Sequence, residues 1–404
     1  MYLATNTHCV CTPFTALRSL PILPSLHISC ADTVCTMRSL PGGLPDYIGQ
    51  YRIQALLGSG GMADVFLGFL DGPAGFVKPV AIKRMKPNLA KSQEFVDLFL
   101  TEARTASLLS HPNVCQLNEL GASDKGGYYM VMEYLVGIPL TKVLAMQMKN
   151  TESIPIGMLI GLAVQACEGI HYAHTLCDPS NNSYNIVHRD LSPPNIYMTV
   201  NGMAKILDFG ISKSTQSVVQ TATGQIRGKF TYMSPEQLRG HALDPRSDVF
   251  SLAIMVFELL TGTRLFKRRS KLETFEAVTI ADIPKAKDLN PTISDAISDA
   301  VEIGLARGRN HRFSSARAFG TALTEAASSV GGAWPAPSIA EFGEKIFSAE
   351  YQANRLRAQP SRSRAMSVQA VAITDDSGDL TIAEENFTHT DDDTRIQLGK
   401  QDEL

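Results

Sequence analysis

The stretch that decides the fold runs from residue 187 to residue 196 and reads Val-His-Arg-Asp-Leu-Ser-Pro-Pro-Asn-Ile. A second stretch, residues 206–210, reads Ile-Leu-Asp-Phe-Gly. Three side chains with oxygen atoms, Asp190, Asn195 and Asp208, lie in turn-like segments beside apolar strands. Either motif alone could be charged loop residues next to core strands. Together they have the layout of a catalytic base with two ligands for magnesium.

A glycine-rich segment lies earlier in the chain, between two patterns typical of β-strands. Residues 58–63 read Gly-Ser-Gly-Gly-Met-Ala, and Val65 follows. Backbone with few side chains lets N–H groups approach phosphate oxygens, and Val65 could cover a ring. Taken alone, such a segment is more often a plain tight turn.

Lys83 lies at the end of an apolar strand, in a segment that reads Val-Ala-Ile-Lys. An ammonium group there is costly unless it meets a carboxylate and a phosphate, although strand-edge lysines usually extend into water. Glu102 is the candidate carboxylate, because it shares one face of a predicted helix with Phe99 and Leu109. A lone glutamate on a helix is normally solvated, so the pairing depends on both residues together.

The order of strand and helix patterns predicts an α+β fold with two lobes. Residues 51–80 predict a small antiparallel sheet, followed by a helix at about 92–109 and strands at 117–121 and 128–132. The chain then turns mostly helical, with periodic runs at 158–174, 247–260, 294–305 and 315–328. We predict one domain over residues 47–334, with a small lobe at 47–134, a hinge at 133–137 and a larger lobe at 138–334.

Both ends of the chain differ from this domain. Residues 1–46 carry four of the seven cysteines and scattered prolines, which predict a disordered leader. We expect a protein that begins at Met37 to keep full activity and stability. An accessory amphipathic helix is predicted over 335–357, with Ile339, Phe342, Ile346 and Phe347 on one face. Residues 358–404 lack apolar periodicity and predict a disordered acidic tail.

Composition and charge disfavour several classes of partner. The net charge of −3 and the pI near 6.3 give no reason to expect nucleic acid or an anionic membrane. The richest apolar stretches, 159–167 and 249–260, are short for a bilayer span, and the N-terminal segment lacks a secretory pattern. We therefore predict no membrane span and a cytoplasmic location. The cysteines lack the paired spacing of a structural zinc site.

In order and spacing, the motifs resemble the eukaryotic-like, or Hanks-type, protein kinase family over about residues 51–327. The resemblance implies the bilobal kinase fold, with ATP and Mg²⁺ as cofactors. It also implies transfer of the γ-phosphoryl group to serine or threonine hydroxyls of protein substrates. Details at residues 188–193 and 228–230, and the extra loop 177–185, resemble kinases of myxobacteria and related bacteria.

The resemblance assigns roles by position. Asp190 would orient the attacking hydroxyl and accept its proton, while Asn195 and Asp208 would bind magnesium. Lys83 would hold the α- and β-phosphates and pair with Glu102. The remaining nucleotide contacts would come from the phosphate loop, the gatekeeper, the hinge backbone and the residues that sandwich adenine: Gly58, Ser59, Gly60 and Gly61; Met132; Glu133 and Leu135; and Leu57, Val65, Ala81 and Tyr197.

Other segments resemble scaffold parts of the family. Residues 232–236, Tyr-Met-Ser-Pro-Glu, resemble its APE segment, and residues 247–252 its central helix. Arg312 resembles the buried partner of Glu236. The long segment from Asp208 to Glu236 shapes a protein-substrate groove in this family, which distinguishes the chain from small-molecule kinases.

The same segment is expected to carry an activating phosphate. Thr223 is the first candidate and Thr221 the second, because a phosphothreonine there could bind Arg189 next to Asp190. The resemblance implies autophosphorylation at this position, through a transient dimer.

The chain departs from the family pattern at three positions. Ala63 replaces the third glycine of the phosphate loop, where a methyl group is a small intrusion. Ser192 replaces the lysine two residues after the catalytic aspartate, and Lys229 replaces a docking-loop threonine. We include Lys229 among the catalytic candidates, because its ammonium could reach the same point from the opposite loop. The alternative is that it faces solvent or an acidic substrate.

Two rival interpretations remain. A pseudokinase scaffold would bind partners without phosphoryl transfer, but the full set of catalytic residues argues against it. A tyrosine-directed kinase is the second rival, since loss of the lysine at position 192 also occurs in that group. Assays of ATP hydrolysis and of the phosphorylated amino acid separate these possibilities.

Overall fold

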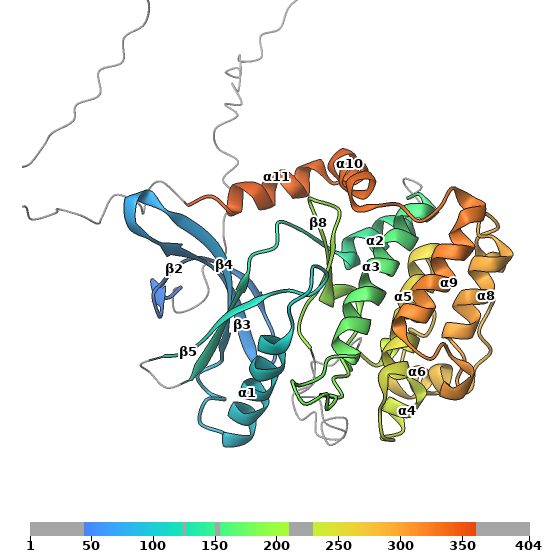
Figure 1. The fold of residues 1–404 in the computed structure, drawn as a ribbon, viewed down its shortest axis with the longest axis horizontal. Helices are drawn as coiled ribbons and strands as arrows, with labels where there is room; N and C mark the ends of the chain where they lie inside the picture. The colour runs from blue at the N-terminus through green and yellow to red at the C-terminus, as the bar shows by residue number, and fades with distance from the viewer. Residues whose placement is uncertain (1–43, 124–126, 150–153, 210–228, 361–404) are drawn as a thin grey trace, which may run out of the picture. The chain divides into compact units, whose positions relative to one another are not determined.

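The computed structural model describes residues 44–123, 127–149, 154–209 and 229–360, all in one unit of the chain that begins at Leu44. Figure 1 shows two parts within this unit: a β-sheet with one helix, and a larger group of helices. The predicted α+β, two-lobed fold is therefore confirmed.

The small lobe is built on a six-stranded antiparallel sheet with the order β1-β2-β3-β4-β6-β5. Helix α1 (Gln93–Leu108) packs against β5 and β6 through the buried side chains of Val96, Phe99 and Ala103. A short 3₁₀ turn, η1 (Pro73–Gly75), lies between β3 and β4. The strands are β1 (Tyr47–Ile48), β2 (Tyr51–Ser59), β3 (Ala63–Asp71), β4 (Val77–Met85), β5 (Leu117–Ala122) and β6 (Tyr128–Glu133).

Strand register fixes which side chains face the space between the lobes. Lys83 of β4 lies opposite Val65 of β3 and Met130 of β6, while Ala81 lies opposite Met132. Residues directly opposite one another point to the same face of a sheet, and so do residues two apart on one strand. Val65, Ala81, Lys83 and Met132 therefore share one face of the small lobe.

The hinge leads from β6 into a second, three-stranded sheet with the order β7-β8-β9. Its strands are β7 (Gly137–Pro139), β8 (Ile196–Thr199) and β9 (Ala204–Ile206), and the 3₁₀ turn η2 (Pro193–Asn195) precedes β8. This small sheet supports the loops that carry Asn195 and Asp208. The predicted hinge at 133–137 spans the gap between β6 and β7.

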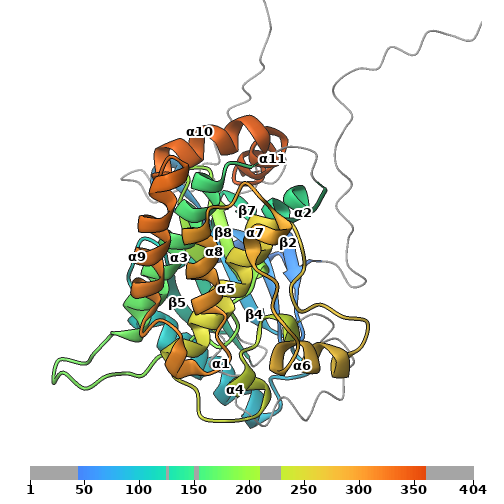
Figure 2. The same cartoon turned by 90° about the vertical axis from the view of Figure 1, so that its right-hand side faces the viewer.

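The large lobe is helical, and Figure 2 shows its main helices side by side. Helices α3 (Ile156–His174) and α5 (Pro245–Thr261) form its core, and α3 packs on both α5 and α9. The other elements are α2 (Leu140–Lys149), η4 (Lys229–Tyr232), α4 (Pro235–Leu238), α6 (Lys271–Thr279), α7 (Ala286–Leu289), α8 (Asp295–Gly304), η5 (Arg309–His311), α9 (Ala316–Ala327) and η6 (Ser328–Val330).

Local signals explain where these helices begin and end. The side chain of Asp244 caps α5 by accepting from the N–H of Arg246, and Gly262 ends the helix in the left-handed region at φ 64°. Serines at positions 270, 294 and 315 cap α6, α8 and α9 in the same way.

One described helix, α3, is long and apolar enough to span a bilayer. In the sequence, only the shorter apolar stretch at 159–167 stands out within it. Two thirds of its most apolar window is buried inside the fold. The helix packs on α5, α9 and strand β9 of the three-stranded sheet. Its apolar composition is therefore that of a helix in the core of the fold.

The predicted single helix over 335–357 is two helices, α10 (Ala336–Ile346) and α11 (Ser348–Arg357). The chain bends at Phe347, which is not helical, and this bend lets both Phe347 and Tyr351 enter the core of the large lobe. The amphipathic face was correctly predicted as far as Ile339 and Phe347 are concerned, since both are buried. The expected leader at 1–46 and the acidic tail at 358–404 lie outside the described residues except at 44–46 and 358–360. There, the carbonyl of Asp46 accepts from the N–H of Ile53 at 2.9 Å, and the carbonyl of Gln359 accepts from Gln54 at 3.3 Å.

Candidate active site

Lys83 is the centre of an ion-pair group between the two lobes. Its Nζ atom lies 2.5 Å from Oε1 of Glu102 on α1 and 2.8 Å from Oδ1 of Asp208. Burial acts to lower the pKa of Lys83, but the charges of Asp208 and Glu102 outweigh burial and raise that pKa above its ordinary value. In Asp208, desolvation acts to raise the pKa, and the charge of Lys83 lowers it below the usual range. Both groups therefore stay ionised at neutral pH.

Asp190 lies in a loop that a buried carboxylate holds in place. Asp248 of α5 accepts hydrogen bonds from the backbone N–H groups of His188, at 2.7 Å, and Arg189, at 3.0 Å. Nε2 of His174, at the end of α3, lies 2.8 Å from the same carboxylate. Burial acts to raise the pKa of Asp248, but the hydrogen bond and charge of His174 lower it. The helical core thus fixes the backbone next to Asp190.

The two sequence motifs meet through Asn195. Its Nδ2 atom donates to the backbone oxygen of Asp190 at 2.8 Å and to the carboxylate of Asp190 at 3.2 Å. The carbonyl of Asn195 accepts from the N–H of Leu207 at 2.8 Å, immediately before Asp208. The structure therefore brings Asp190, Asn195 and Asp208 together, as the sequence predicted.

A cavity of about 490 Å³ opens between the lobes beside these residues. Most of the predicted nucleotide contacts line it: Leu57, Gly58, Val65, Ala81, Met132, Glu133, Leu135, Asn195, Tyr197 and Asp208. Apolar side chains from both lobes and residues of the hinge contribute to its lining. Such a slot suits a flat ring with a charged tail.

The other predicted positions lie nearby but do not line this cavity. Ser59, Gly60 and Gly61 form the tip of the β2–β3 hairpin, which the N–H of Gly60 closes on the carbonyl of Ala63 at 2.8 Å. A Cβ atom added at Gly58 or Gly61 would meet no described atom within 4 Å, so the backbone there is open to a ligand. The side chain of Lys229 and the threonines at 221 and 223 lie outside the described part of the structure.

Sequence reasoning missed several residues that support the site. His174 is one of them, and its only signal was a histidine at the end of an apolar helix. Lys205 is another: its Nζ atom lies 2.6 Å from Oε1 of Glu133, and the same oxygen accepts from the N–H of Gln116 at 2.9 Å. These contacts turn the Glu133 side chain toward Lys205 and help to fix the start of the hinge.

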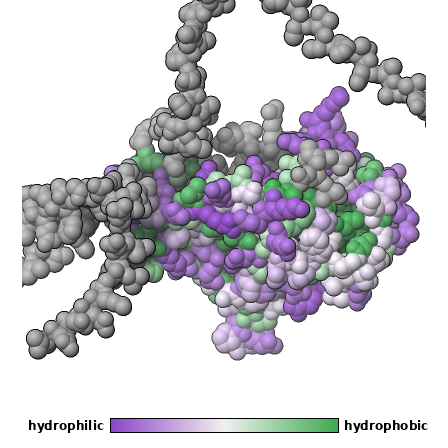
Figure 3. Space-filling view, turned by 90° about the horizontal axis from the view of Figure 1, so that it is seen from above, coloured by the Kyte–Doolittle hydropathy of each residue, from purple (hydrophilic) through white to green (hydrophobic). Residues whose placement is uncertain are grey.

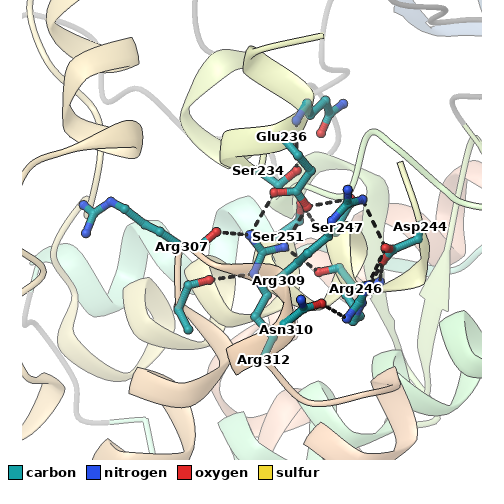
Figure 4. A network of polar contacts seen from close by, with 12 residues as sticks. Ser234, Glu236, Asp244, Arg246, Ser247, Ser251, Arg307, Arg309, Asn310 and Arg312 are labelled. Atoms are coloured by element: carbon teal, nitrogen blue, oxygen red, sulfur yellow. Dashed lines mark hydrogen bonds and ion pairs between the residues drawn. The ribbon is translucent and has the colours of Figure 1, made fainter. Parts of the chain in front are cut away.

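Arg312 and Glu236 form a second, buried polar group in the large lobe (Figure 4). The Nη1 and Nη2 atoms of Arg312 lie 2.7 and 2.8 Å from the two carboxylate oxygens of Glu236. Ser247 also donates to Glu236, at 2.7 Å. Burial acts to raise the pKa of Glu236, but hydrogen bonds and charge from Arg312 lower it to about 2. This geometry agrees with the predicted scaffold pairing.

The remaining donors of Arg312 are also satisfied. Its guanidinium donates to the backbone oxygens of Ala306, Arg246 and Arg307 at 2.6, 2.9 and 3.1 Å. It also lies over the ring of Phe250, at 4.7 Å. The pair therefore ties the segment after residue 229 to α5 and to the chain before α9.

Comparison with known proteins identifies this set of motifs. The family model "Protein kinase domain" matches residues 51–323. A tyrosine-protein kinase, MasK of Myxococcus xanthus, is 37% identical over 304 residues, which are 74% of this chain and 47% of that protein. The serine/threonine-protein kinase PknA of Mycobacterium tuberculosis is 33% identical over 279 residues, 68% of this chain and 61% of PknA.

The fold comparison agrees. The crystal structure of the PknI kinase domain of Mycobacterium tuberculosis matches 71% of this chain and 100% of its own, with a TM-score of 0.54 and 24% sequence identity. The chain spans about half to three fifths of the length of the curated relatives MasK and PknA. The matched region contains every motif described above, and the chain belongs to the protein kinase family, in its bacterial Hanks-type branch.

Proposed function

We propose that this chain transfers the γ-phosphoryl group of ATP to serine or threonine hydroxyls of proteins. The observation that carries the proposal is the ion-pair group of Lys83, which contacts Glu102 and also Asp208, and Asp208 lines a ring-sized cavity. In phosphoryl transfer, positioning and charge stabilisation supply almost all of the catalysis.

The donor set fits a nucleotide with magnesium. Asn195 and Asp208 offer one amide and one carboxylate, and no cluster of three or more His, Cys, Asp or Glu ligands occurs among residues 44–123, 127–149, 154–209 and 229–360. Mg²⁺ commonly uses one or two protein oxygens together with phosphate oxygens and water. Bound there, it would neutralise charge on the phosphates.

The residues of this chain divide the remaining work. Lys83 is placed to hold phosphate oxygens, and its links to α1 and to Asp208 fix its position. Asp190, oriented by Asn195, is placed to accept a proton from the attacking hydroxyl. The hinge backbone at Glu133 and Leu135 would hold the edge of the adenine, between Val65 and Ala81 on one side and Tyr197 on the other.

The alternative to serine and threonine as acceptors is tyrosine. MasK is named a tyrosine-protein kinase, whereas PknA and PrkC of Bacillus subtilis are named serine/threonine-protein kinases. Ser192, which replaces a lysine of the family pattern, also favours the tyrosine alternative. Its side chain is buried and donates a long hydrogen bond, 3.5 Å, to the backbone oxygen of Asp190.

Phosphoamino-acid analysis tests the proposal. After incubation of the full chain with labelled Mg-ATP and a general protein substrate, we expect phosphoserine and phosphothreonine in both proteins. Phosphotyrosine alone would favour the tyrosine-directed alternative. Absence of both label and ATP hydrolysis would favour the pseudokinase alternative.

A further expected result concerns autophosphorylation. Nε of Arg189 is buried without a hydrogen-bond partner among the described residues, and a phosphate nearby would satisfy it through charge-assisted bonds. We expect mass spectrometry of active protein to find phosphate at Thr223 or, second, at Thr221. An active protein that carries no phosphate between residues 213 and 231 would contradict this regulation.

Lys229 remains a proposed catalytic residue. The argument is that two positions differ from the family pattern at once: Ser192 replaces a lysine in one loop, and Lys229 adds a lysine in the other. An ammonium from the opposite loop could supply the same positive charge to the transferred phosphoryl group.

A further inference from the structure

One wall of the nucleotide cavity comes from outside the kinase domain. Glu350, Ala353, Asn354 and Arg357 of α11 line the same cavity as the hinge and Asp208. These positions follow the spacing i, i+3, i+4 and i+7, so they form one face of the helix. The family model ends at residue 323, and α11 is therefore an addition to the matched domain.

Direct hydrogen bonds hold α11 against both lobes. Nδ2 of Asn354 donates to the carbonyl of Gly137, the first residue of β7 after the hinge, at 2.7 Å. Nε2 of Gln54, on β2 of the small lobe, donates to the carbonyls of Arg357 and Gln359 at 3.1 and 3.3 Å. In Figure 1, α11 accordingly extends from the side of α10 toward the β-sheet.

The large lobe is shaped to receive the segment that leads to α11. Gly202, at φ 74°, lies so close to the carbonyl of Ala336 that an added Cβ would be only 1.9 Å from it. A Cβ at Gly161 would lie 2.3 Å from the carbonyl of Trp334, and the N–H of Trp334 donates to the carbonyl of Gly157 at 2.9 Å. Side chains at these two glycines would push α10 away. The large lobe therefore packs closely against the segment that leads to α11.

Buried aromatic groups complete the anchor. Phe347 and Tyr351 lie in the core of the large lobe, and burial of two such side chains is a large apolar contribution. The outer side of α11 is different: Arg355 pairs with Glu344 of α10, and these two side chains remain about half exposed, at 47% and 46%. Figure 3, which looks down on this side, shows a band of hydrophilic residues across it.

We propose that α11 is the outer wall of the nucleotide site, and that nucleotide binding and docking of α11 stabilise each other. This inference rests on the proposed function, because it assigns the cavity to a nucleotide. Asn354 is the positioning residue, since it fixes α11 to the end of the hinge. Arg357 and Glu350, together with Lys142 of α2, add charge to the lining of the cavity. Linkage requires that each event favours the other by the same factor.

Binding of ADP to the full chain tests this inference. Asn354→Ala removes the bond to Gly137, and Arg357→Ala removes a charge from the cavity face. We expect each to raise the Kd for Mg-ADP, measured by calorimetry, by about fivefold or more. Arg355→Ala is the matched control: it removes the same type of charge two residues away, on the outer face, and should change the Kd by less than about twofold.

Amide hydrogen exchange gives a second measurement. In the wild-type chain, residues 348–357 should exchange more slowly with ADP bound than without it, and in the Asn354→Ala chain this protection should shrink. Wild-type affinity in both cavity-face variants, with unchanged exchange in α11, would overturn the inference and leave the proposed function intact. If the wild-type chain binds no adenine nucleotide, the proposed function fails first and the inference fails with it.

Discussion

The Asp190→Asn chain should transfer phosphate about 10²–10⁴ times more slowly than the wild-type chain, because a general base contributes a factor of this size. The structure explains why the fold should survive. The amide of Asn195 bonds mainly to the backbone oxygen of Asp190, and an asparagine side chain would still offer it an oxygen. The measurement is kcat for a protein substrate at saturating Mg-ATP, together with the Kd for ADP, which should change little.

A matched control separates this effect from a general loss of charge. Asp295→Asn makes the same chemical change at an exposed surface ion pair with Lys287, far along the chain from the site. Its kcat should equal that of the wild type, because surface pairs contribute little. Near-normal kcat in the Asp190→Asn chain would remove the proposed role of Asp190 and favour another base.

The parts of the site that sequence predicted are those carried by local patterns. Lys83 was recognisable because it follows the apolar residues of a strand pattern, although β4 continues to Met85, and Glu102 because it interrupts an apolar helix face. Asp190 and Asn195 lie five positions apart in a single loop, so their contact needed no knowledge of the rest of the fold. In each case the signal that marked the residue lay within one element or one loop.

Contacts across long stretches of chain could not be predicted in this way. Asp248 lies 74 positions from His174, and nothing in the sequence near Asp248 indicates that it would hold the loop of Asp190. The resemblance to the kinase family placed Asp248 in the central helix and gave it no further role. Its role depends on how α3 and α5 pack, which is a tertiary property.

The helix after the domain shows the same limit more clearly. The apolar spacing of Ile339 and Phe347 predicted burial correctly, because periodicity reports which face is apolar. It could not predict the bend at Phe347, since the chain beyond it is mostly polar and α11 buries only Tyr351. Nor could it predict that Asn354 would reach Gly137, 217 positions away. A polar residue on a surface-like helix has no sequence signal for such a contact.

The Arg312→Leu chain should lose about 3–5 kcal/mol of unfolding free energy, because the change leaves the Glu236 carboxylate buried without its partner. The side chain of Arg312 has 0% exposure, so water cannot replace the lost hydrogen bonds. Denaturant unfolding at neutral pH measures the change. Arg317→Leu is the control, because Arg317 forms a similar 2.8 Å pair with Glu168 at 55% and 36% exposure and should cost at most about 1 kcal/mol.

The dependence on pH distinguishes loss of the ion pair from loss of packing. In the wild type, the pKa of Glu236 is lowered from 4.5 to about 2, so its stabilisation is complete above about pH 4.5 and is lost as the pH falls toward 2. In the Arg312→Leu chain, burial without the charge of Arg312 should raise this pKa instead, and protonation should relieve the penalty as the pH falls. The stability difference between the two chains should therefore be constant near neutral pH and shrink in acid. A difference that stays constant down to pH 4 would mean that Arg312 stabilises the fold by packing on Phe250 and by its backbone hydrogen bonds, and not through the charge of Glu236.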